Sequence, residues 1–435
     1  MSGTKCFEVL DKIFKPKKQE KIENIKGYTL KYGHIVENTE IVDEVLVSYF
    51  KAPKSYTAEN MCEINTHGGN VIVRKILDLC LKNGAELAEP GEFTKRAFLN
   101  GRIDLSQAES VIDVIDAKSE KEAKAGIKQL EGALSKKINE IKQEIMDVMI
   151  NIDVSIDYPE YDVDDVTNSQ ILDMLDSVCI KLEKLEKSFD NGKIVKEGIK
   201  TAIIGKPNAG KSSLLNAILK EDRAIVTEYA GTTRDTIEEF ATVEGIPLKL
   251  IDTAGIRNAN DEVEKIGVDI AKKKLKNAML VIEVFDISRE LDEEDLELLE
   301  YVKKLGKKVI IVLNKSDLEN VVERSQLEKY SDYVIEISAK LDEGREELQK
   351  ATEKLLGIGG YDADSTIFAN ERQIACAERA RKYLAMALES LDMGETLDAV
   401  TVMIDNGANA LLELTGEKAT EAVVDEVFSK FCVGK

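Results

Sequence analysis

The sequence is poor in the residues that build metal centres, and it has no apolar run long enough to cross a membrane. It holds two histidines, and its six cysteines form no C-x-x-C pair, so no zinc-binding pattern is present. Reduced thiols in a cytosolic compartment are the simplest interpretation. No apolar run reaches the ~18 residues of a membrane-spanning helix, and Lys5, Asp11 and Lys12 interrupt any early segment that would resemble a signal peptide. We therefore expect a cytoplasmic protein with no membrane segment.

Positive charge is also in deficit. The chain has 60 Lys and Arg against 82 Asp and Glu, which gives a net charge of −22 at pH 7. This acidic balance disfavours broad coating of nucleic acid by the chain alone, although it leaves room for a local basic patch. Two short lysine clusters, "KPKKQEK" (15–21) and "KKKLK" (272–276), are candidates for such a patch. Each is more typical of a solvated surface.

The length predicts more than one domain. A chain of 435 residues exceeds the size at which a single core keeps growing, so two to four domains are expected. Residues 1–104 mix strand-like segments at 44–50 and 61–67 with a helical segment at 71–84 that stops at Gly84. We therefore predict a small α+β domain at the start of the chain.

Two helical segments follow at different places in the sequence. Within 105–195, apolar residues recur at heptad-like spacing from 127 to 152 and again from 171 to 189, with a break around Pro159. Within 358–435, residues 367–430 are again helical in pattern. These stripes favour the core of a helical bundle over a coiled coil with a partner.

The pattern changes between residues 196 and 357. Short apolar strands alternate there with helical segments, which is typical of an α/β domain with a mainly parallel sheet. The predicted strands are 201–204, 248–251, 279–285, 308–313 and 333–337. We therefore predict an α/β nucleotide domain inserted into a helical domain, so that 105–195 and 358–435 pack together.

One glycine-rich stretch predicts phosphate binding. In "GKPNAGKS", Gly205, Gly210, Lys211 and Ser212 have the spacing of a P-loop, and the stretch follows a predicted strand and precedes a helix. Backbone N–H groups of such a loop wrap the phosphates. Lys211 should reach the β and γ phosphates, and the hydroxyl of Ser212 should ligate Mg²⁺.

The remaining motifs select the nucleotide. "NKSD" (314–317) follows a strand, and Asp317 offers two acceptors to the N1–H and 2-amino donors of guanine. Adenine lacks that pair of donors, so the carboxylate would disfavour ATP. "SAK" (338–340) can give a backbone N–H to the guanine carbonyl. With "GTTRD" (231–235) and "DTAG" (252–255) between them, these pieces predict a GTPase domain resembling the Ras superfamily.

The residue that positions the attacking water is less obvious. Many related GTPases carry a glutamine directly after the glycine of D-x-x-G, but Ile256 occupies that position here and cannot orient water. Glu264, in "DEVEKIG", carries a carboxylate that could order the water. The competing interpretation is that Glu264 is a solvated surface acid.

Charge compensation in the transition state is a second open question, because phosphoryl transfer often uses an arginine. Arg234 and Arg257 are present, and neither position identifies an arginine finger. A monovalent cation is the alternative, with one oxygen ligand from Asn208 and backbone carbonyls of 227–232. The plainer interpretation is that Asn208 only shapes the loop.

The chain as a whole resembles the MnmE (TrmE) family of tRNA-modification GTPases. The resemblance rests on the GTPase motifs, on "GEFTKRAFLNGRIDLSQAE" (91–109) and on "FCVGK" (431–435), and it covers essentially all 435 residues. It implies a K⁺-activated GTPase that works with the FAD-containing protein MnmG in a heterotetramer. Together they would add a carboxymethylaminomethyl or aminomethyl group to C5 of wobble uridine in certain tRNAs. The family binds 5-formyltetrahydrofolate in its N-terminal domain, dimerises through that domain, and closes its nucleotide domains on GTP hydrolysis.

The resemblance also assigns individual residues. It implies K⁺ ligands at Asn208, Thr227, Tyr229 and Thr232, Mg²⁺ ligands at Ser212 and Thr233, folate contacts at Glu63, Arg102 and Lys435, and catalytic roles for Glu264 and Cys432. Together with the motifs it predicts GTP contacts at Asn208, Ala209, Gly210, Lys211, Ser212, Ser213, Thr227, Glu228, Tyr229, Ala230, Gly231, Thr232, Thr233, Asp252, Thr253, Ala254, Gly255, Asn314, Lys315, Asp317, Ser338, Ala339 and Lys340.

The start of the chain departs from the family. Met1-Ser2-Gly3 matches the end of the family's Arg-x-Ser-Gly motif, so the resemblance implies that a short N-terminal family segment with a folate-contacting arginine is absent. The chain as printed is therefore expected to bind folate poorly and to dimerise weakly.

A second class of function stays open at this point. A GTP-dependent binding switch for ribosome assembly or signalling would need no modification chemistry. Such a protein would be expected to carry an RNA-binding module after the GTPase domain, where this sequence has a helical pattern that ends in "FCVGK".

Overall fold

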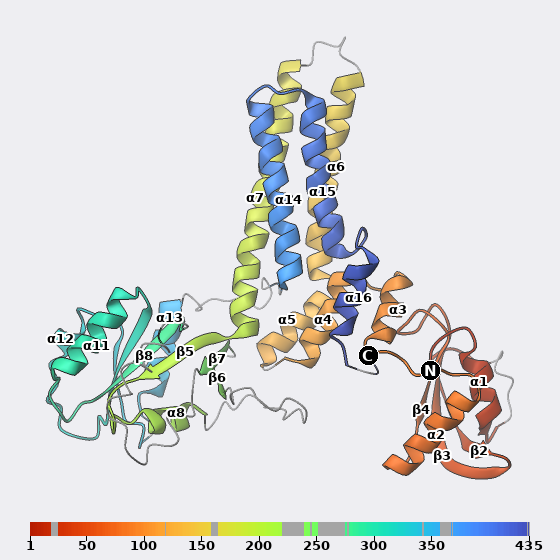
Figure 1. The fold of residues 1–435 in the computed structure, drawn as a ribbon, viewed down its shortest axis with the longest axis horizontal. Helices are drawn as coiled ribbons and strands as arrows, with labels where there is room; N and C mark the ends of the chain where they lie inside the picture. Colours follow the sequence, from red (N-terminus) through yellow and green to blue (C-terminus); the bar gives the residue numbers. More distant parts are fainter. Residues whose placement is uncertain are drawn as a thin grey trace. The chain divides into compact units, whose positions relative to one another are not determined.

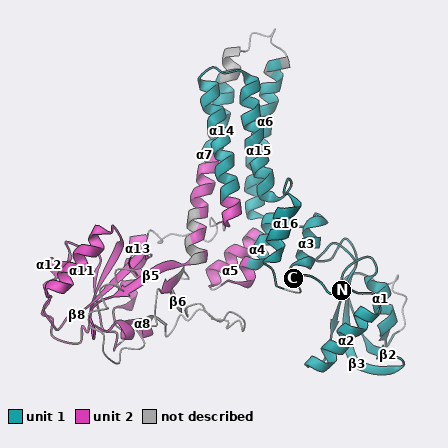
Figure 2. Ribbon diagram, in the orientation of Figure 1, with its two compact units in different colours: residues 1–112, 130–180, 375–435 teal, residues 113–129, 181–374 magenta. Residues whose placement is uncertain are grey.

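A computed structural model describes most of the chain. The described residues are 1–18, 25–117, 119–157, 164–219, 239–243, 246–250, 275, 278–341, 343–356, 367, 369–432 and 434. The chain divides into two compact units, of which the first comprises residues 1–112, 130–180 and 375–435 and the second 113–129 and 181–374 (Figure 2). The domain boundaries predicted after residues 104, 195 and 357 stay predictions.

The first unit begins with a four-stranded antiparallel sheet. Its elements are α1 (Cys6–Ile13), β1 (Phe14–Pro16), β2 (Thr29–Glu37), β3 (Glu40–Phe50), β4 (Met61–Asn65) and α2 (Asn70–Lys82), and the strand order is β1-β2-β3-β4. Alternate residues of β3, from Val45 to Tyr49, point to one face, where α1 and α2 cover them. Ser2 forms an antiparallel bridge with Met61, so the start of the chain lies along β4.

Helices make up the rest of the first unit and continue into the second. They are α3 (Glu92–Leu99), α4 (Leu105–Ile115), α5 (Glu120–Leu130), α6 (Ala133–Asp157), α7 (Asp164–Glu197), α14 (Glu371–Asp392), α15 (Leu397–Thr415) and α16 (Glu421–Ser429). In the bundle of the first unit, α6 packs along α15 (Figure 1). The predicted packing of the two helical segments on each other is therefore confirmed.

One part of the predicted apolar stripe is wrong. The stripe residues from Leu134 to Ile152 that recur along one face of α6 are buried as expected, but Ile127 is 45% exposed. Gly132, with φ +89°, separates α5 from α6, so the heptad-like spacing does not continue across it on one helix face.

The second unit is built on a six-stranded sheet. Its strands are β5 (Ile199–Ile204), β6 (Glu239–Val243), β7 (Ile246–Leu250), β8 (Leu280–Asp286), β9 (Lys308–Asn314) and β10 (Val334–Ile337), in the order β10-β9-β8-β5-β7-β6. All neighbouring pairs are parallel except β6 with β7. The mainly parallel sheet predicted from the apolar runs is therefore confirmed.

Helices cover both faces of this sheet, as the buried strands require. They include α8 (Lys211–Leu219), α11 (Glu293–Lys304), α12 (Arg324–Leu327) and α13 (Arg345–Leu356). Leu214 of α8 and Leu348 of α13 belong to the core on one face, and Leu299 of α11 belongs to the core on the other. In the described part of the chain, no helix is both long and apolar enough to span a bilayer.

Candidate functional site

The predicted P-loop joins β5 to α8 at the carboxyl end of the sheet. Gly205 has φ +140°, and a Cβ there would lie 2.2 Å from the carbonyl oxygen of Val284 in β8. Gly210 has φ +94°, and a Cβ there would lie 1.9 Å from the side-chain nitrogen of Asn314. Only glycine fits such approaches without moving backbone or a buried amide. The two motif glycines therefore let the loop lie against β8 and the "NKSD" segment.

Asn314 connects three pieces of the site. Its side-chain N–H donates to the carbonyl oxygen of Ala209 at 2.9 Å, and its side-chain oxygen accepts from the backbone N–H of Ala339 at 3.1 Å. The residue is 3% exposed, so both bonds are shielded from water. This bridge between the P-loop and the "SAK" segment was not evident from the sequence, because it depends on the convergence of β5, β9 and β10.

The predicted base-recognition residues lie together after β9 and β10. Asp317 accepts a hydrogen bond from the hydroxyl of Ser338 at 2.8 Å, which fixes the carboxylate beside the second motif. Lys315 forms a 2.5 Å ion pair with Asp286 at the end of β8. Burial opposes ionisation of Asp286, but bonds from Lys315 and Ser288 outweigh it and lower the pKa of that carboxyl.

Lys211 and Ser212 lie at the start of α8, where phosphates bind in P-loop proteins. The ammonium of Lys211 donates to the carbonyl oxygens of Gly205 at 2.8 Å and Lys206 at 2.6 Å. A phosphate would offer the same ammonium a full negative charge and a stronger bond. The hydroxyl of Ser212 is a hard oxygen donor of the kind that Mg²⁺ prefers, so this residue fits the predicted metal.

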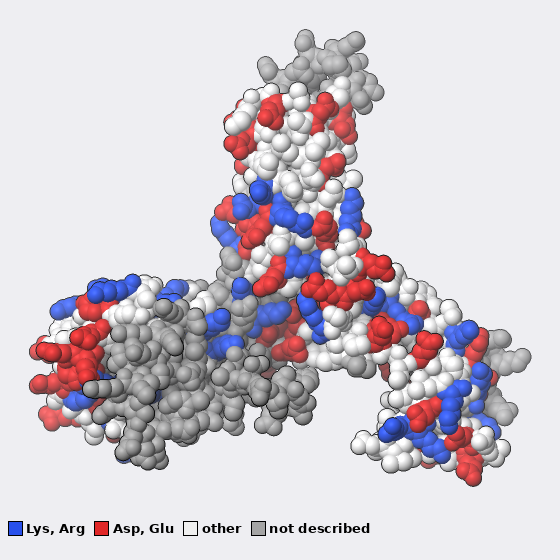
Figure 3. Space-filling model, in the orientation of Figure 1, with Lys and Arg blue, Asp and Glu red and all other residues white. Residues whose placement is uncertain are grey.

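A further ion-pair cluster ties the loop to α11. The carboxylate of Asp292 caps α11 by accepting from the N–H groups of Glu294 and Asp295. Lys206 pairs with Asp292 and, at 2.8 Å, with Glu294. Acidic side chains gather over α11 on the surface shown in Figure 3. The D-x-x-D spacing of the cap is visible in the sequence, but the pairing with Lys206 is not.

The structure brings together part of the predicted nucleotide site. Residues 208–213, Asn314, Lys315, Asp317 and 338–340 all lie in the second unit, around the carboxyl ends of the strands. The residues predicted at 227–233, at 252–255 and at Glu264 lie outside the described residues.

One predicted K⁺ ligand is among the described residues. Asn208 has φ +64° and carries a side-chain oxygen in the P-loop, which is compatible with its predicted role as a K⁺ ligand. Among the described residues, no cluster of His, Cys, Asp or Glu could hold a metal ion.

The residues predicted to contact folate, and the cysteine near the chain end, lie in the first unit. Glu63 is exposed on β4. Arg102 donates a hydrogen bond to the carbonyl oxygen of Tyr56 at 3.1 Å, and its guanidinium carbon lies 5.0 Å from the centre of the Tyr56 ring. Cys432 is exposed, and its carbonyl oxygen accepts from the N–H of Gly91 at 3.4 Å. Lys435 lies outside the described residues.

A P-loop, an N-K-x-D segment and an S-A-K segment at the carboxyl ends of one parallel sheet define a P-loop GTPase domain. Comparison with known sequences then identifies the family of GTPases to which the chain belongs. The profile of the "MnmE helical domain" matches residues 105–432, and that of the "GTP-binding protein TrmE N-terminus" matches residues 1–102. The chain belongs to the MnmE family of tRNA modification GTPases.

Full-length relatives agree with the profiles. The tRNA modification GTPase MnmE of Thermoanaerobacter pseudethanolicus is 47% identical over 440 residues, covering 100% of this chain and 95% of the relative. That of Clostridioides difficile is 46% identical over 438 residues, with the same coverage of both chains. A solved G domain of the T. maritima FeoB iron transporter is 29% identical and covers 36% of this chain and 98% of its own, with a TM-score of 0.28.

Family membership resolves the choice left open by the sequence. The chain is a GTP hydrolase that belongs to a family of tRNA modification GTPases. A binding switch without modification chemistry is set aside on the same ground. The described residues of the P-loop, "NKSD" and "SAK" segments supply an arrangement that can hold a guanine nucleotide.

Proposed function

We propose that this chain is a cytoplasmic, K⁺-stimulated GTPase in which hydrolysis drives closure of the nucleotide domains. With an FAD-containing MnmG-type partner, in a heterotetramer, it adds a carboxymethylaminomethyl or aminomethyl group to C5 of wobble uridine in certain tRNAs. The observation that carries the nucleotide part is the bridge made by Asn314, because it holds the phosphate loop and the base-recognition segments in one rigid arrangement. Family membership supports the modification part.

The residues of the nucleotide site have separable roles in this proposal. Asp317, oriented by Ser338, accepts the two guanine donors and so selects GTP. Lys211 exchanges its contacts with loop carbonyls for the β and γ phosphates, and backbone N–H groups at the start of α8 surround them. Glu264 orients the attacking water. The remaining GTP contacts are those assigned above at 227–233 and 252–255.

Two cations complete the site. Ser212 and Thr233 hold Mg²⁺, and Asn208, Thr227, Tyr229 and Thr232 hold K⁺. When bound, these ions would supply positive charge that offsets the negative charge of the phosphate oxygens. The oxygen donors of the described residues Ser212 and Asn208 support this assignment.

The modification chemistry is assigned to the other unit. Glu63, Arg102 and Lys435 bind 5-formyltetrahydrofolate or a related folate, which carries a one-carbon unit, and Cys432 takes part in the modification step. In domain terms, residues 1–104 bind folate and mediate homodimerisation. The nucleotide domain (196–357) is inserted between helical segments 105–195 and 358–435.

The experiment that tests this function is nucleoside analysis of tRNA from cells with and without the protein. The modified wobble uridine should disappear when the protein is absent and return when it is supplied, while Asp317→Asn should fail to restore it at normal GTP levels. Identical nucleoside profiles in the two strains would contradict the proposal. GTP hydrolysis measured on the purified chain then tests the nucleotide assignment separately from the modification assignment.

A further inference from the structure

Helix α3 lies between the carboxyl-terminal segment and the start of the chain in the first unit. On one side it contacts α16 and the residues after it: Lys95 forms a 2.6 Å ion pair with Asp425, and the rings of Phe98 and Phe428 lie 6.2 Å apart. The turn before α3 holds Cys432 through the N–H of Gly91. Cys432 is thus joined to the turn that precedes α3, while α16 packs against α3 itself.

On its other side, α3 contacts the loop between β3 and β4. Thr94 is hydrogen-bonded to Tyr56 at 2.9 Å, and the side chain of Asn100 donates to the carbonyl oxygen of Thr57 at 2.7 Å. Ser2, at the start of the chain, donates to Glu59 at 2.9 Å and contacts Thr57 at 2.6 Å. The loop and the first residues of the chain therefore meet on this side of α3.

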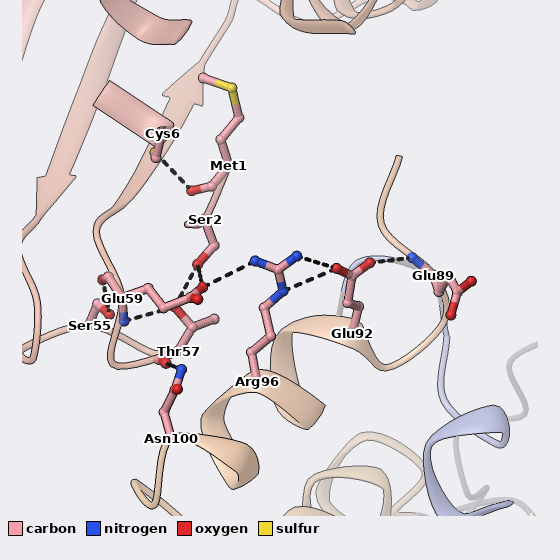
Figure 4. A network of polar contacts seen from close by, with 10 residues as sticks. All are labelled: Met1, Ser2, Cys6, Ser55, Thr57, Glu59, Glu89, Glu92, Arg96 and Asn100. Atoms are coloured by element: carbon pink, nitrogen blue, oxygen red, sulfur yellow. Dashed lines mark hydrogen bonds and ion pairs between the residues drawn. The ribbon is translucent and has the colours of Figure 1, made fainter. Parts of the chain in front are cut away.

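Arg96 connects the two sides (Figure 4). Its guanidinium pairs with Glu59 at 3.2 Å and, through two nitrogens, with Oε1 of Glu92. The other oxygen of Glu92 accepts from the backbone N–H of Glu89 at 2.8 Å, which fixes the turn containing Gly91. Burial opposes ionisation of Glu92, but the bonds from Glu89 and Arg96 prevail and lower its pKa.

The turn itself leaves little freedom for the cysteine segment. Gly91 has φ +71°, and a Cβ there would lie 2.8 Å from the carbonyl oxygen of Phe428 and 2.9 Å from Cβ of Phe431. The backbone of 428–432 therefore packs directly on this glycine. A displacement of the turn would move Cys432 with it.

We propose that Arg96 is a positioning residue for tRNA modification: through Glu59 and Glu92 it sets where the Cys432 segment lies relative to the start of the chain and the β3–β4 loop. The inference rests on the proposed function, in which Cys432 takes part in the modification. Arg96 suits the role because a planar guanidinium can bond two carboxylates at once and stays charged at every physiological pH. A lysine offers a single ammonium and would keep only part of this geometry.

The test uses purified full-length variants added to an extract of cells that lack the protein, which supplies the other components. Modification is measured at varied tRNA concentration, and GTP hydrolysis and Tm are measured on the same preparations. The variants are Arg96→Gln, Arg96→Lys, Glu59→Gln and Cys432→Ser. Arg379→Gln is the matched control, because Arg379 pairs with Glu413 between α14 and α15 and its side chain is also partly exposed, at 51% against 35% for Arg96.

Misplacing a reacting group by about 1 Å can cost on the order of 10²-fold in rate. We therefore expect Arg96→Gln to lower kcat for modification by about tenfold to about 10²-fold, with KM for tRNA and GTP hydrolysis unchanged. Arg96→Lys should recover part of the loss, Glu59→Gln should resemble a milder Arg96→Gln, and Arg379→Gln should match wild type. Hydrogen exchange in the 421–432 peptide should quicken most in Arg96→Gln, less in Arg96→Lys and Glu59→Gln, and not in Arg379→Gln.

Two results would overturn the inference. One is normal kcat in Arg96→Gln when Cys432→Ser is inactive. The other is a loss of modification, GTP hydrolysis and Tm together in both Arg96 variants, which indicates a purely structural residue. Normal modification in Cys432→Ser would instead contradict the proposed function, and the Arg96 proposal would fall with it.

Discussion

The nucleotide site and the junction at α3 both hold segments that are distant in the sequence, but they do so with different interactions. At the nucleotide site, Asn314 is 3% exposed and bonds backbone groups of Ala209 and Ala339, both of which pack in or against the apolar core of one sheet face. At the junction, Arg96 has a side chain that is 35% exposed and relies on two carboxylates. Buried neutral bonds are rigid and insensitive to salt, whereas partly exposed ion pairs are weaker and are screened.

This difference suggests how the two activities can be separated by mutation. Changes at the nucleotide site should lower GTP binding or hydrolysis, and tRNA modification should fall as a consequence. Changes at the junction should leave GTP hydrolysis intact, because the contacts described above join residues of the first unit.

Replacing Asp317 by Asn should produce the largest change. The carboxylate loses its pairing with two guanine donors, so GTP affinity should fall on the order of 10²-fold or more, as expected for charged hydrogen bonds. Xanthosine triphosphate should be preferred, because the Asn amide can donate to its extra carbonyl. Calorimetric titration with both nucleotides measures the switch, and Glu319→Gln, an exposed carboxylate two residues away, serves as control. Unchanged GTP affinity would place the base site elsewhere.

Glu264→Ala tests the proposed water-positioning residue. Loss of such a group should lower GTP turnover by about 10²-fold while GTP affinity stays nearly normal. Single-turnover hydrolysis and equilibrium binding, measured side by side, separate the two quantities. An equal fall in binding and turnover would show that Glu264 supports the structure instead.

A buried carboxyl group in β8 should make the stability of the second unit depend on pH. Burial, with a smaller contribution from Asp295, raises the pKa of Glu283 to about 8, and neither of its carboxyl oxygens has a hydrogen-bond partner in the part of the chain that the structure describes. The folded state thus holds the proton more tightly than the unfolded state, whose ordinary value is 4.5. The stabilisation is complete below that value and is lost as the pH rises through about 8.

Glu283→Gln should remove this dependence. The free energy of unfolding of the variant should exceed that of wild type by a few kcal/mol at pH 8, and the gap should narrow towards pH 5. Glu336→Gln, on an exposed position of β10, should behave like wild type at both pH values. Chemical denaturation monitored at pH 5 and pH 8 provides the comparison, and a gap independent of pH would mean that Glu283 does not hold a proton in the folded state.

Exchanging Na⁺ for K⁺ at equal ionic strength should raise GTP hydrolysis by about tenfold if the cation supplies the charge that an arginine provides elsewhere. The increase should vanish in Asn208→Ala, whose side chain offers no oxygen. Initial rates in the two salts give the answer directly. Equal rates for wild type in the two salts would instead favour Arg234 or Arg257 as the source of positive charge in the transition state.

The smallest expected effect concerns the turn before α3. Gly91→Ala combines a left-handed backbone, which costs about 1–2 kcal/mol for a residue with a side chain, with a close approach to Phe428. Gly394→Ala is the matched control, because Gly394 has φ +77° with nothing within 4 Å of the added carbon. Thermal unfolding should show the larger loss in Gly91→Ala, together with reduced modification. Equal losses of thermal stability in the two variants would mean that the Cys432 segment does not pack closely against this turn.

Much of the nucleotide unit could be predicted from the sequence, because its apolar strands are short and four of the five predicted ones are followed directly by a motif. The strand predicted at 308–313 is observed as Lys308–Asn314, and that at 333–337 as Val334–Ile337. Other elements were missed, mostly where the residues near them in the sequence do not determine their secondary structure. Helix α1 was not predicted, although its buried residues Cys6, Val9, Leu10 and Ile13 follow helical spacing. The three-residue strand β1 is too short to carry a period, and the break at Gly132 is visible only as a single glycine.

The junction at α3 could not be predicted in the same way. The spacing of Glu92 and Arg96 on a helix favours their ion pair, and that part is readable. The contacts of Arg96 with Glu59 and of Gly91 with Cys432 join residues that are far apart in the chain, so they follow from the fold alone. No local pattern marks either of them.

The central claim is that GTP hydrolysis and the modification step depend on separate parts of the chain. The most direct measurement is a comparison of Cys432→Ser with wild type, in which GTP turnover on the purified protein and wobble-uridine modification of tRNA are measured on the same preparation. We predict normal GTP turnover and loss of the modified nucleoside. A loss of both activities, or the persistence of both, would contradict the separation.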